Sequence, residues 1–92
     1  MFYEWDEAKR MRNIDRHRLD FEDVDLLFGG LHITRPAKTV GQEARMMAVG
    51  MIGDVHVTVI YTLRDSNTRV ISLRRASYGE RKRHQEIYEG GA

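Results

Sequence analysis

The sequence predicts a single α+β domain over residues 1–92, in which two N-terminal helices and a C-terminal helix pack on a small antiparallel sheet. Three observations indicate this class. Residues 55–63 alternate apolar and polar side chains, as a half-buried strand does. Residues 7–17 are mostly good helix formers and follow Asp6, a residue type that caps helices. Ser77 and Glu80 have the spacing of a capping box, which predicts the start of a last helix.

The N-terminal part predicts a short strand and two helices. The aromatic segment 2–5 is expected to be extended. In the helix over 7–17, apolar residues recur at every third position and predict an apolar stripe. The stripe consists of Ala8, Met11 and Ile14. Asp20 is the cap candidate for a short second helix, which Gly29-Gly30 ends. Its predicted buried face consists of Phe21, Val24, Leu27 and Phe28.

The rest of the chain predicts the sheet. Residues 31–36 are expected to form an edge strand that ends at the single proline. Three further strands are expected, and they cover residues 45–52, 55–63 and 69–74. Gly53-Asp54 predicts a tight turn between the first two of them, and residues 65–68 predict a polar turn before the last.

Composition excludes several kinds of site. The chain has no cysteine, so it forms no disulfide and no thiolate metal site. Its histidines lack metal-ligand spacing, and it has neither a glycine-rich phosphate loop nor a nucleophile elbow. The sequence therefore predicts no metal and no cofactor. No apolar run approaches ~20 residues and the N-terminus lacks a signal-peptide core, which predicts a cytoplasmic protein without a membrane span.

Charge is unevenly distributed, although the net charge is only +1. Residues 1–44 hold seven Lys/Arg and nine Asp/Glu, whereas residues 45–92 hold eight and five. Between Arg69 and Arg83 there are six basic residues and a single acid, Glu80. Such a patch suits a polyanion such as RNA. The alternative interpretation is a solvated basic helix beside arginines at strand ends.

Four arginines lie at the ends of two neighbouring predicted strands, where they would form a phosphate-binding surface. They are Arg64, Arg69, Arg74 and Arg75. RNA carries its own nucleophile, the 2′-hydroxyl, so its cleavage needs a base, an acid and a cation that stabilises the phosphorane. Arginine suits the last role. The titratable candidates for the other two are Lys9, His17, Tyr61, Glu80 and His84.

These residues also have structural interpretations. Arg64 beside a turn can be a solvated rim residue, and Arg74 can pair with an acid such as Glu80. Tyr61 shares a strand face with valines and fits the core better than a catalytic role.

The histidines have such interpretations too. His17 can interact with the carboxyl end of its own helix. His56 and His84 are expected at the surface.

Ordered motifs along nearly the whole chain resemble those of the BrnT toxins. The first are Phe2-x-x-Trp5-Asp6-x-x-Lys9, Asn13-x-x-x-His17 and Phe21-Glu22-Asp23. The later ones are Glu43-x-Arg45, Gly50-x-x-Gly53, Val59-Ile60-Tyr61-Thr62-x-Arg64, Arg69-Val70-Ile71-Ser72-x-Arg74-x-Ala76 and Ser77-x-x-Glu80-Arg81. The resemblance implies a RelE-like fold and a type II toxin that cleaves RNA and inhibits translation. It also implies a BrnA-like antitoxin with a ribbon-helix-helix segment, through which alone the complex would bind operator DNA.

The main hypothesis is therefore a ribonuclease toxin that works without a metal. We expect Arg64 and Arg74 to bind the scissile phosphate and stabilise the transition state. The candidates for proton transfer are Lys9, His17 and Glu80. The supporting RNA-binding residues are Arg45, Arg69, Arg75 and Arg81.

Two other functions stay open. An inactive RelE-like protein would pair with a DNA-binding antitoxin and act only in transcriptional autoregulation. A protein that binds RNA without cutting it would show strongly salt-dependent binding and leave the RNA intact. The antitoxin surface is expected around Leu26, Leu27 and Leu31, or along the edge strand near Ile33.

Overall fold

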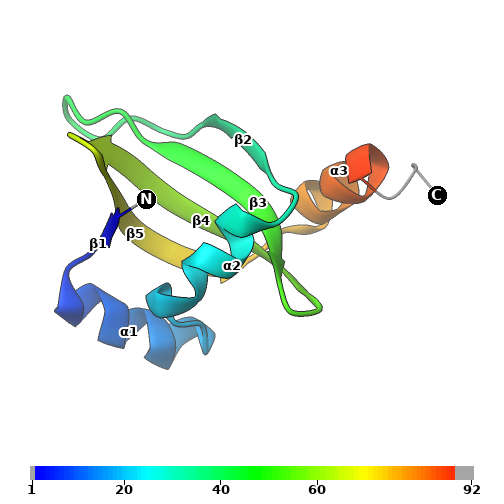
Figure 1. Ribbon diagram of the computed structural model, residues 1–92, viewed down its shortest axis with the longest axis horizontal. Helices are drawn as coiled ribbons and strands as arrows, with labels where there is room; N and C mark the ends of the chain where they lie inside the picture. Colours follow the sequence, from blue (N-terminus) through cyan, green and yellow to red (C-terminus); the bar gives the residue numbers. More distant parts are fainter. Residues whose placement is uncertain (1, 89–92) are drawn as a thin grey trace.

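The computed structural model describes residues 2–88 and has an α+β fold. One five-stranded sheet runs in the order β1-β5-β4-β3-β2 (Figure 1). Its strands are β1 (Phe2–Glu4), β2 (Ile33–Pro36), β3 (Met46–Ile52), β4 (Val55–Arg64) and β5 (Asn67–Arg75). The helical elements in this part of the chain are α1 (Glu7–His17), the 3₁₀ turn η1 (Phe21–Asp23), α2 (Val24–Gly29) and α3 (Tyr78–Tyr88). None of these helices is long and apolar enough to span a membrane.

The sheet is mixed, whereas the sequence predicted an antiparallel one. Strands β2 to β5 do pair in antiparallel fashion. Strand β1, however, pairs in parallel with β5, with Phe2 opposite Asn67 and Glu4 opposite Arg69. A parallel neighbour needs a long crossover connection, and the chain from α1 to β4 supplies it here. The prediction was therefore wrong for one edge of the sheet.

The core lies between one face of the sheet and the η1–α2 segment, as predicted. Phe21, Val24 and Leu27 are buried there. The sheet residues that pack with them are Ala48, Val57, Val59, Tyr61, Val70 and Leu73. Asp20 caps η1, because its Oδ1 accepts a hydrogen bond from the backbone N–H of Glu22 at 2.9 Å. The structural interpretation of Tyr61 is thus confirmed.

Helix α1 has the predicted bounds but packs through a different face. Asp6 caps it, since Oδ1 accepts from the backbone N–H of Ala8 at 2.8 Å. The predicted apolar stripe is wrong as a packing face, because Ala8 is exposed and Met11 is 56% exposed. The buried residue is Asn13, at 6% exposure. Its side chain makes two hydrogen bonds with the backbone of Leu73 on β5. Asn13 Nδ2 donates to the carbonyl oxygen of Leu73 at 2.8 Å, and the Leu73 N–H donates to Asn13 Oδ1 at 3.1 Å.

The Asn13 contact explains the error. Strand β1 covers the outer edge of β5 only as far as Arg69, so the backbone of Leu73, which pairs with β4 on its other side, has no strand on this side. A buried backbone group needs a hydrogen-bond partner, and the side-chain amide of Asn13 provides both a donor and an acceptor. A polar residue therefore holds α1 where an apolar stripe was expected.

Helix α3 packs against β3 and β4 at one end of the sheet, on the face opposite the core. It begins with the predicted capping box: Glu80 N donates to Ser77 Oγ at 3.2 Å, and Ser77 N donates to Glu80 Oε1 at 2.8 Å. Thr58, which alternates with the core valines of β4, points toward α3, and its Oγ1 donates to Glu80 Oε1 at 2.9 Å. In Figure 1, α3 lies at the end of the sheet away from α1.

The expectation that both His56 and His84 lie at the surface was wrong. His84 is 3% exposed, and its Nε2 lies 2.9 Å from the carbonyl oxygen of Leu31. The His56 ring is half-buried, with its centroid 5.2 Å from that of His84. The polar face of β4 looked solvent-facing in the sequence because the pattern contained no sign that α3 folds over it.

Candidate functional site

The register of β4 and β5 separates the two arginines that were expected to act together. Arg64 lies opposite Asn67, next to the β4–β5 turn, whereas Arg74 lies opposite Thr58. Thr58 and Arg64 are six residues apart on β4, which corresponds to ~20 Å along a strand. The structure therefore does not bring Arg64 and Arg74 into one phosphate-binding surface.

Arg74 is fixed by an ion pair with Glu80. Arg74 Nη1 donates to Glu80 Oε1 at 2.8 Å, and Nη2 donates to Oε2 at 3.0 Å. Such a bidentate pair sets the plane of the guanidinium. The Glu80 side chain is 9% exposed and also accepts hydrogen bonds from Thr58 and the Ser77 backbone. The pairing interpretation of Arg74 is thus confirmed.

The same contacts decide the charge of both groups. The hydrogen bond from Arg74 is the largest cause that lowers the pKa of Glu80, to about 2, although burial opposes the shift. Glu80 in turn raises the pKa of Arg74. Both side chains are therefore charged at neutral pH, and Glu80 is a poor proton donor there.

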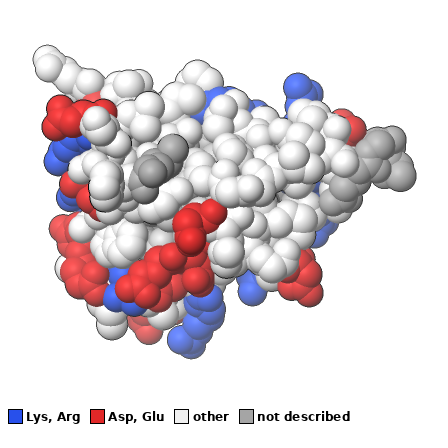
Figure 2. Space-filling view, in the orientation of Figure 1, with Lys and Arg blue, Asp and Glu red and all other residues white. Residues whose placement is uncertain are grey.

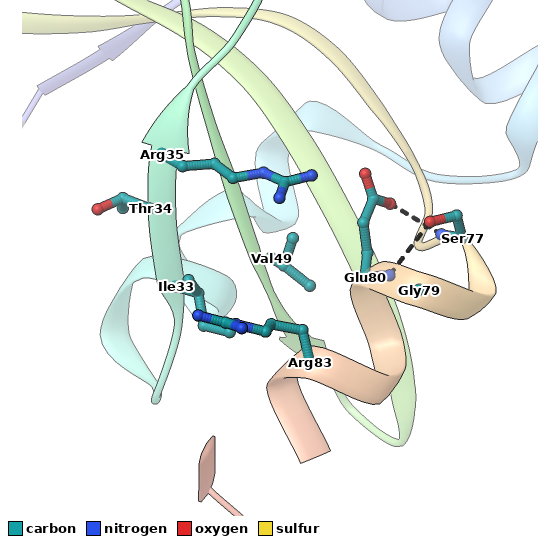
Figure 3. Close-up of a pocket in the computed structure, with 8 residues that line it drawn as sticks. All are labelled: Ile33, Thr34, Arg35, Val49, Ser77, Gly79, Glu80 and Arg83. Carbon is teal, nitrogen blue, oxygen red and sulfur yellow. Dashed lines mark hydrogen bonds between the residues drawn. The ribbon is translucent and has the colours of Figure 1, made fainter. Parts of the chain in front are cut away.

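A pocket of about 590 Å³ lies beside this ion pair, between β2 and α3. We call it the β2–α3 pocket. Its lining residues are Ile33, Thr34, Arg35, Val49, Ser77, Gly79, Glu80 and Arg83. Figure 3 shows Arg35 reaching from β2 toward α3, and Arg83 reaching from α3 toward β2. Two guanidiniums thus approach the pocket from opposite walls, and Figure 3 shows the Glu80 carboxylate between Arg35 and Ser77.

Neither Arg35 nor Arg83 was singled out in the sequence. Arg83 belongs to the basic run that begins at Arg69, so the local charge was a usable signal. Arg35 lies in a short edge strand and carried no signal, because its partners in the pocket are far away along the chain.

Lys9 and His17 lie together in a second site, on α1. A groove of about 250 Å³ separates them from the edge of β5, and we call it the α1 groove. Its lining residues are Lys9, Arg12, Asn13, Arg16, His17 and Ile71. Asn13 bonds to β5 from the side of α1, whereas Glu80 binds the face of β4 under α3. The proton-transfer candidates are therefore divided between two sites.

The supporting arginines are dispersed. Arg45 Nε donates to Glu43 Oε1 at 3.2 Å, and Arg69 Nη1 donates to Glu4 Oε2 at 3.5 Å. Arg75 and Arg81 line a smaller pocket of about 240 Å³ next to the β3–β4 turn. The acids beside Arg45 and Arg69 offset part of their charge.

Acidic side chains gather on a part of the surface away from the β2–α3 pocket. Figure 2 shows Asp and Glu gathered over α1 and α2 on the face turned toward the viewer. The segment from η1 into α2 contributes the exposed residues Glu22, Asp23 and Asp25. This face repels a polyanion. Within residues 2–88 there is no group of three His, Asp or Glu side chains that could hold a metal ion.

The sequence of this chain matches the model of a known protein family. The model described as "Ribonuclease toxin, BrnT, of type II toxin-antitoxin system" matches residues 5–80. The matched range begins before α1 and extends to Glu80, so it includes the α1 groove and the Arg74–Glu80 ion pair. No curated protein matches the chain.

Proposed function

Because this chain belongs to the BrnT family of ribonuclease toxins of type II toxin–antitoxin systems, we propose that it cleaves RNA at the β2–α3 pocket and thereby inhibits translation. The observation that supports this most directly is the pocket itself, which is lined by two arginines from opposite walls and by the Glu80 carboxylate that Arg74 holds. We assign a RelE-like fold to the domain. The attacking group is the 2′-hydroxyl of the RNA, so the reaction needs no metal. Its oxygen forms the new bond to phosphorus, the bond from phosphorus to the 5′-oxygen breaks, and the departing 5′-oxygen takes up a proton from water.

Arg35 and Arg83 are the proposed phosphate ligands. They line the pocket from opposite walls and carry permanent charge. Negative charge grows on the phosphate as the 2′-hydroxyl attacks, so donors already in place stabilise the transition state more than the ground state. Arg74 acts as a positioning residue, because its guanidinium holds the Glu80 carboxylate at the pocket wall.

Glu80, one of the candidates for proton transfer, is the proposed acceptor of the 2′-hydroxyl proton. Its pKa of about 2 keeps it ionised, and it also makes it a weak base at neutral pH. Arginine stabilisation of the phosphorane therefore supplies most of the acceleration in this proposal. Lys9 and His17 have no proton-transfer role in it, since they line the α1 groove instead. Arg64 and the four dispersed arginines remain proposed contacts to flanking RNA.

The protein partner in this proposal is a BrnA-like antitoxin with a ribbon-helix-helix segment, which neutralises the toxin in the cytoplasm and carries the complex to operator DNA. Of the three leucines expected at its surface, Leu27 is fully buried in the core and is not available. Leu26 and Leu31 are more than half exposed, so they remain the proposed contact area.

The test is cleavage of total RNA by purified, antitoxin-free protein in excess EDTA, with Arg83→Gln beside Lys38→Gln. Both positions are exposed, and each substitution removes one positive charge, but Lys38 lies outside the pocket. We expect Arg83→Gln to slow cleavage at least about tenfold and Lys38→Gln to cleave like the wild type. Intact RNA with the wild type, both as purified RNA and in a translating extract, would contradict the proposal and favour the inactive, autoregulatory partner.

A further inference from the structure

The α1 groove gathers positive charge, which the carboxylate of Asp6 near Lys9 and Arg12 offsets only in part. Lys9, Arg12, Arg16 and His17 line it, and no Asp or Glu does so among residues 2–88. The neighbouring Arg10 shows the contrast, because its Nε and Nη2 donate to the two carboxylate oxygens of Asp20 at 2.8 and 2.9 Å. Like charges three and four positions apart destabilise a helix unless an anion lies between them. The groove is therefore suited to bind one.

The groove is also held in place. Asn13 lies among the basic residues and binds the Leu73 backbone from a buried position, which fixes α1 against β5. On the other wall, the β-bulge leaves Ile71 without a partner on β4, since Ser72 faces Ile60 and Val70 faces Tyr61. Bulges re-aim a side chain, and here Ile71 lines the groove. The basic side chains thus extend from a fixed helix along a fixed edge.

The composition of the groove favours a nucleic acid over an acidic protein. Among residues 2–88, Ile71 is the single apolar residue that lines it, whereas a protein interface has an apolar centre. Nucleic-acid sites are polar and strongly positive, as this groove is. From Lys9 to Arg16 the helix axis advances ~10 Å, so the charges follow a line and can meet successive phosphates of one strand.

The position of the groove connects it with the proposed cleavage pocket. Leu73 bonds to Asn13, and the next residue, Arg74, bonds to Glu80 at the β2–α3 pocket. The edge of β5 at Leu73 lies beyond the reach of β1. A strand that leaves the pocket can therefore pass around this edge to α1. We propose that the α1 groove binds the phosphate backbone of the RNA substrate outside the cleavage pocket, a role that rests on the proposed ribonuclease function.

The test uses a 2′-O-methyl oligonucleotide, which has the phosphates of RNA but no free 2′-hydroxyl to be cleaved. Its binding is measured by fluorescence anisotropy over a series of NaCl concentrations. The variants are Arg12→Gln, Arg16→Gln and the double substitution, and Lys38→Gln is the control that removes a charge elsewhere. All three positions are exposed, so we expect folded proteins; circular dichroism checks this.

Each groove substitution should weaken binding several-fold and reduce the slope of log K against log salt by about 0.7, and the double variant should reduce it by about 1.4. Lys38→Gln should leave the slope unchanged. Unchanged slopes in all groove variants would overturn the proposal. Two other results would also overturn it. If the variants lose antitoxin binding but bind RNA normally, the groove is a protein interface. If they bind RNA with normal affinity but lose kcat at saturating RNA, the chemistry takes place in the groove.

A cleavage assay on natural RNA separates this proposal from the one it rests on. If the wild type cleaves RNA but the groove variants bind like the wild type, the groove proposal fails alone. If binding depends on the groove but the wild type cuts no RNA, the ribonuclease proposal fails and the binding site stands.

Discussion

At the scale of single residues, one carboxylate joins three parts of the molecule. Glu80 accepts hydrogen bonds from Arg74 at the end of β5, from Thr58 on β4 and from Ser77 at the start of α3. Its pKa is lowered from 4.5 to about 2, chiefly by Arg74. A group whose pKa is lower in the folded state stabilises the fold above its unfolded pKa, and this contribution disappears as the pH falls toward the folded value.

This linkage makes Glu80→Gln a sharp test. Glutamine keeps the size but loses the charge, and we expect a loss of about 2 kcal/mol in the free energy of unfolding at pH 7, a figure kept low because Arg74 is 36% exposed. The wild type should lose this margin between about pH 5 and pH 2, and the variant should not. Urea unfolding at pH 7 and pH 3 measures the loss of stability and its pH dependence. Glu86→Gln, at an exposed position on the same helix, is the control. Equal pH dependence in wild type and Glu80→Gln would show that the ion pair does not stabilise the fold.

Single residues also set the limit of the sequence prediction. The helix caps at Asp6 and Ser77 could be predicted because the partners lie two or three positions away. The role of Asn13 could not, because its partner Leu73 is sixty positions away. An apolar stripe looked like the better packing face, and the need for hydrogen bonds at the free edge of β5 decided otherwise.

At the scale of elements, α2 packs on β3 at a glycine. A Cβ atom added to Gly50 would lie 3.0 Å from Leu27 Cγ, 3.2 Å from His32 Cβ and 3.4 Å from the carbonyl oxygen of Leu31. Leu27 is fully buried, and side chains in a close-packed core have little room to move. The close approach of helix and strand therefore depends on the missing side chain.

We expect Gly50→Ala to destabilise the fold by about 1–3 kcal/mol, because it pushes α2 away from β3. Gly79→Ala is the matched control. Gly79 lies in the first turn of α3, and an added Cβ there meets nothing within 4 Å. That substitution should stabilise the fold by about 0.5–1 kcal/mol, since alanine loses less backbone entropy in a helix. Thermal unfolding of both variants tests the pair, and a stable Gly50→Ala would show that α2 is free to shift.

Elements were predicted better than the relations between them. The strong alternation of 55–63 and the capping motifs correspond to β4, α1 and α3, nearly at the predicted bounds. The parallel pairing of β1 and the cover of β4 by α3 had no local signal. Both β2–α3 pocket arginines were missed for this reason, because Arg35 and Arg83 meet only after α3 has folded across the sheet.

At the scale of the whole molecule, a net charge of +1 conceals surface regions of different sign. Acid gathers over α1 and α2 in the view of Figure 2, and arginines line the β2–α3 pocket and the α1 groove. Long-range attraction of RNA is weak for such a protein, so affinity must come from local contacts with phosphates. An RNA that contacts both arginine-lined sites should therefore bind more tightly than an RNA that contacts a single site.

The affinity of the protein for RNA should therefore depend on the length of the RNA. The molecule measures 38 × 27 × 23 Å, and a stacked strand advances ~3.4 Å per nucleotide, so ~10 nucleotides are needed to pass from the β2–α3 pocket around the edge of β5 to the α1 groove. The affinity of 2′-O-methyl oligonucleotides should therefore rise steeply as their length increases from about 4 to about 10 nucleotides, because the second contact becomes intramolecular. The rise should be absent in the Arg12→Gln/Arg16→Gln variant and normal in Lys38→Gln. A rise that persists in the groove variant would mean that the longer strand follows another path over the protein, and the dispersed arginines at Arg75 and Arg81 would then mark the next surface to substitute.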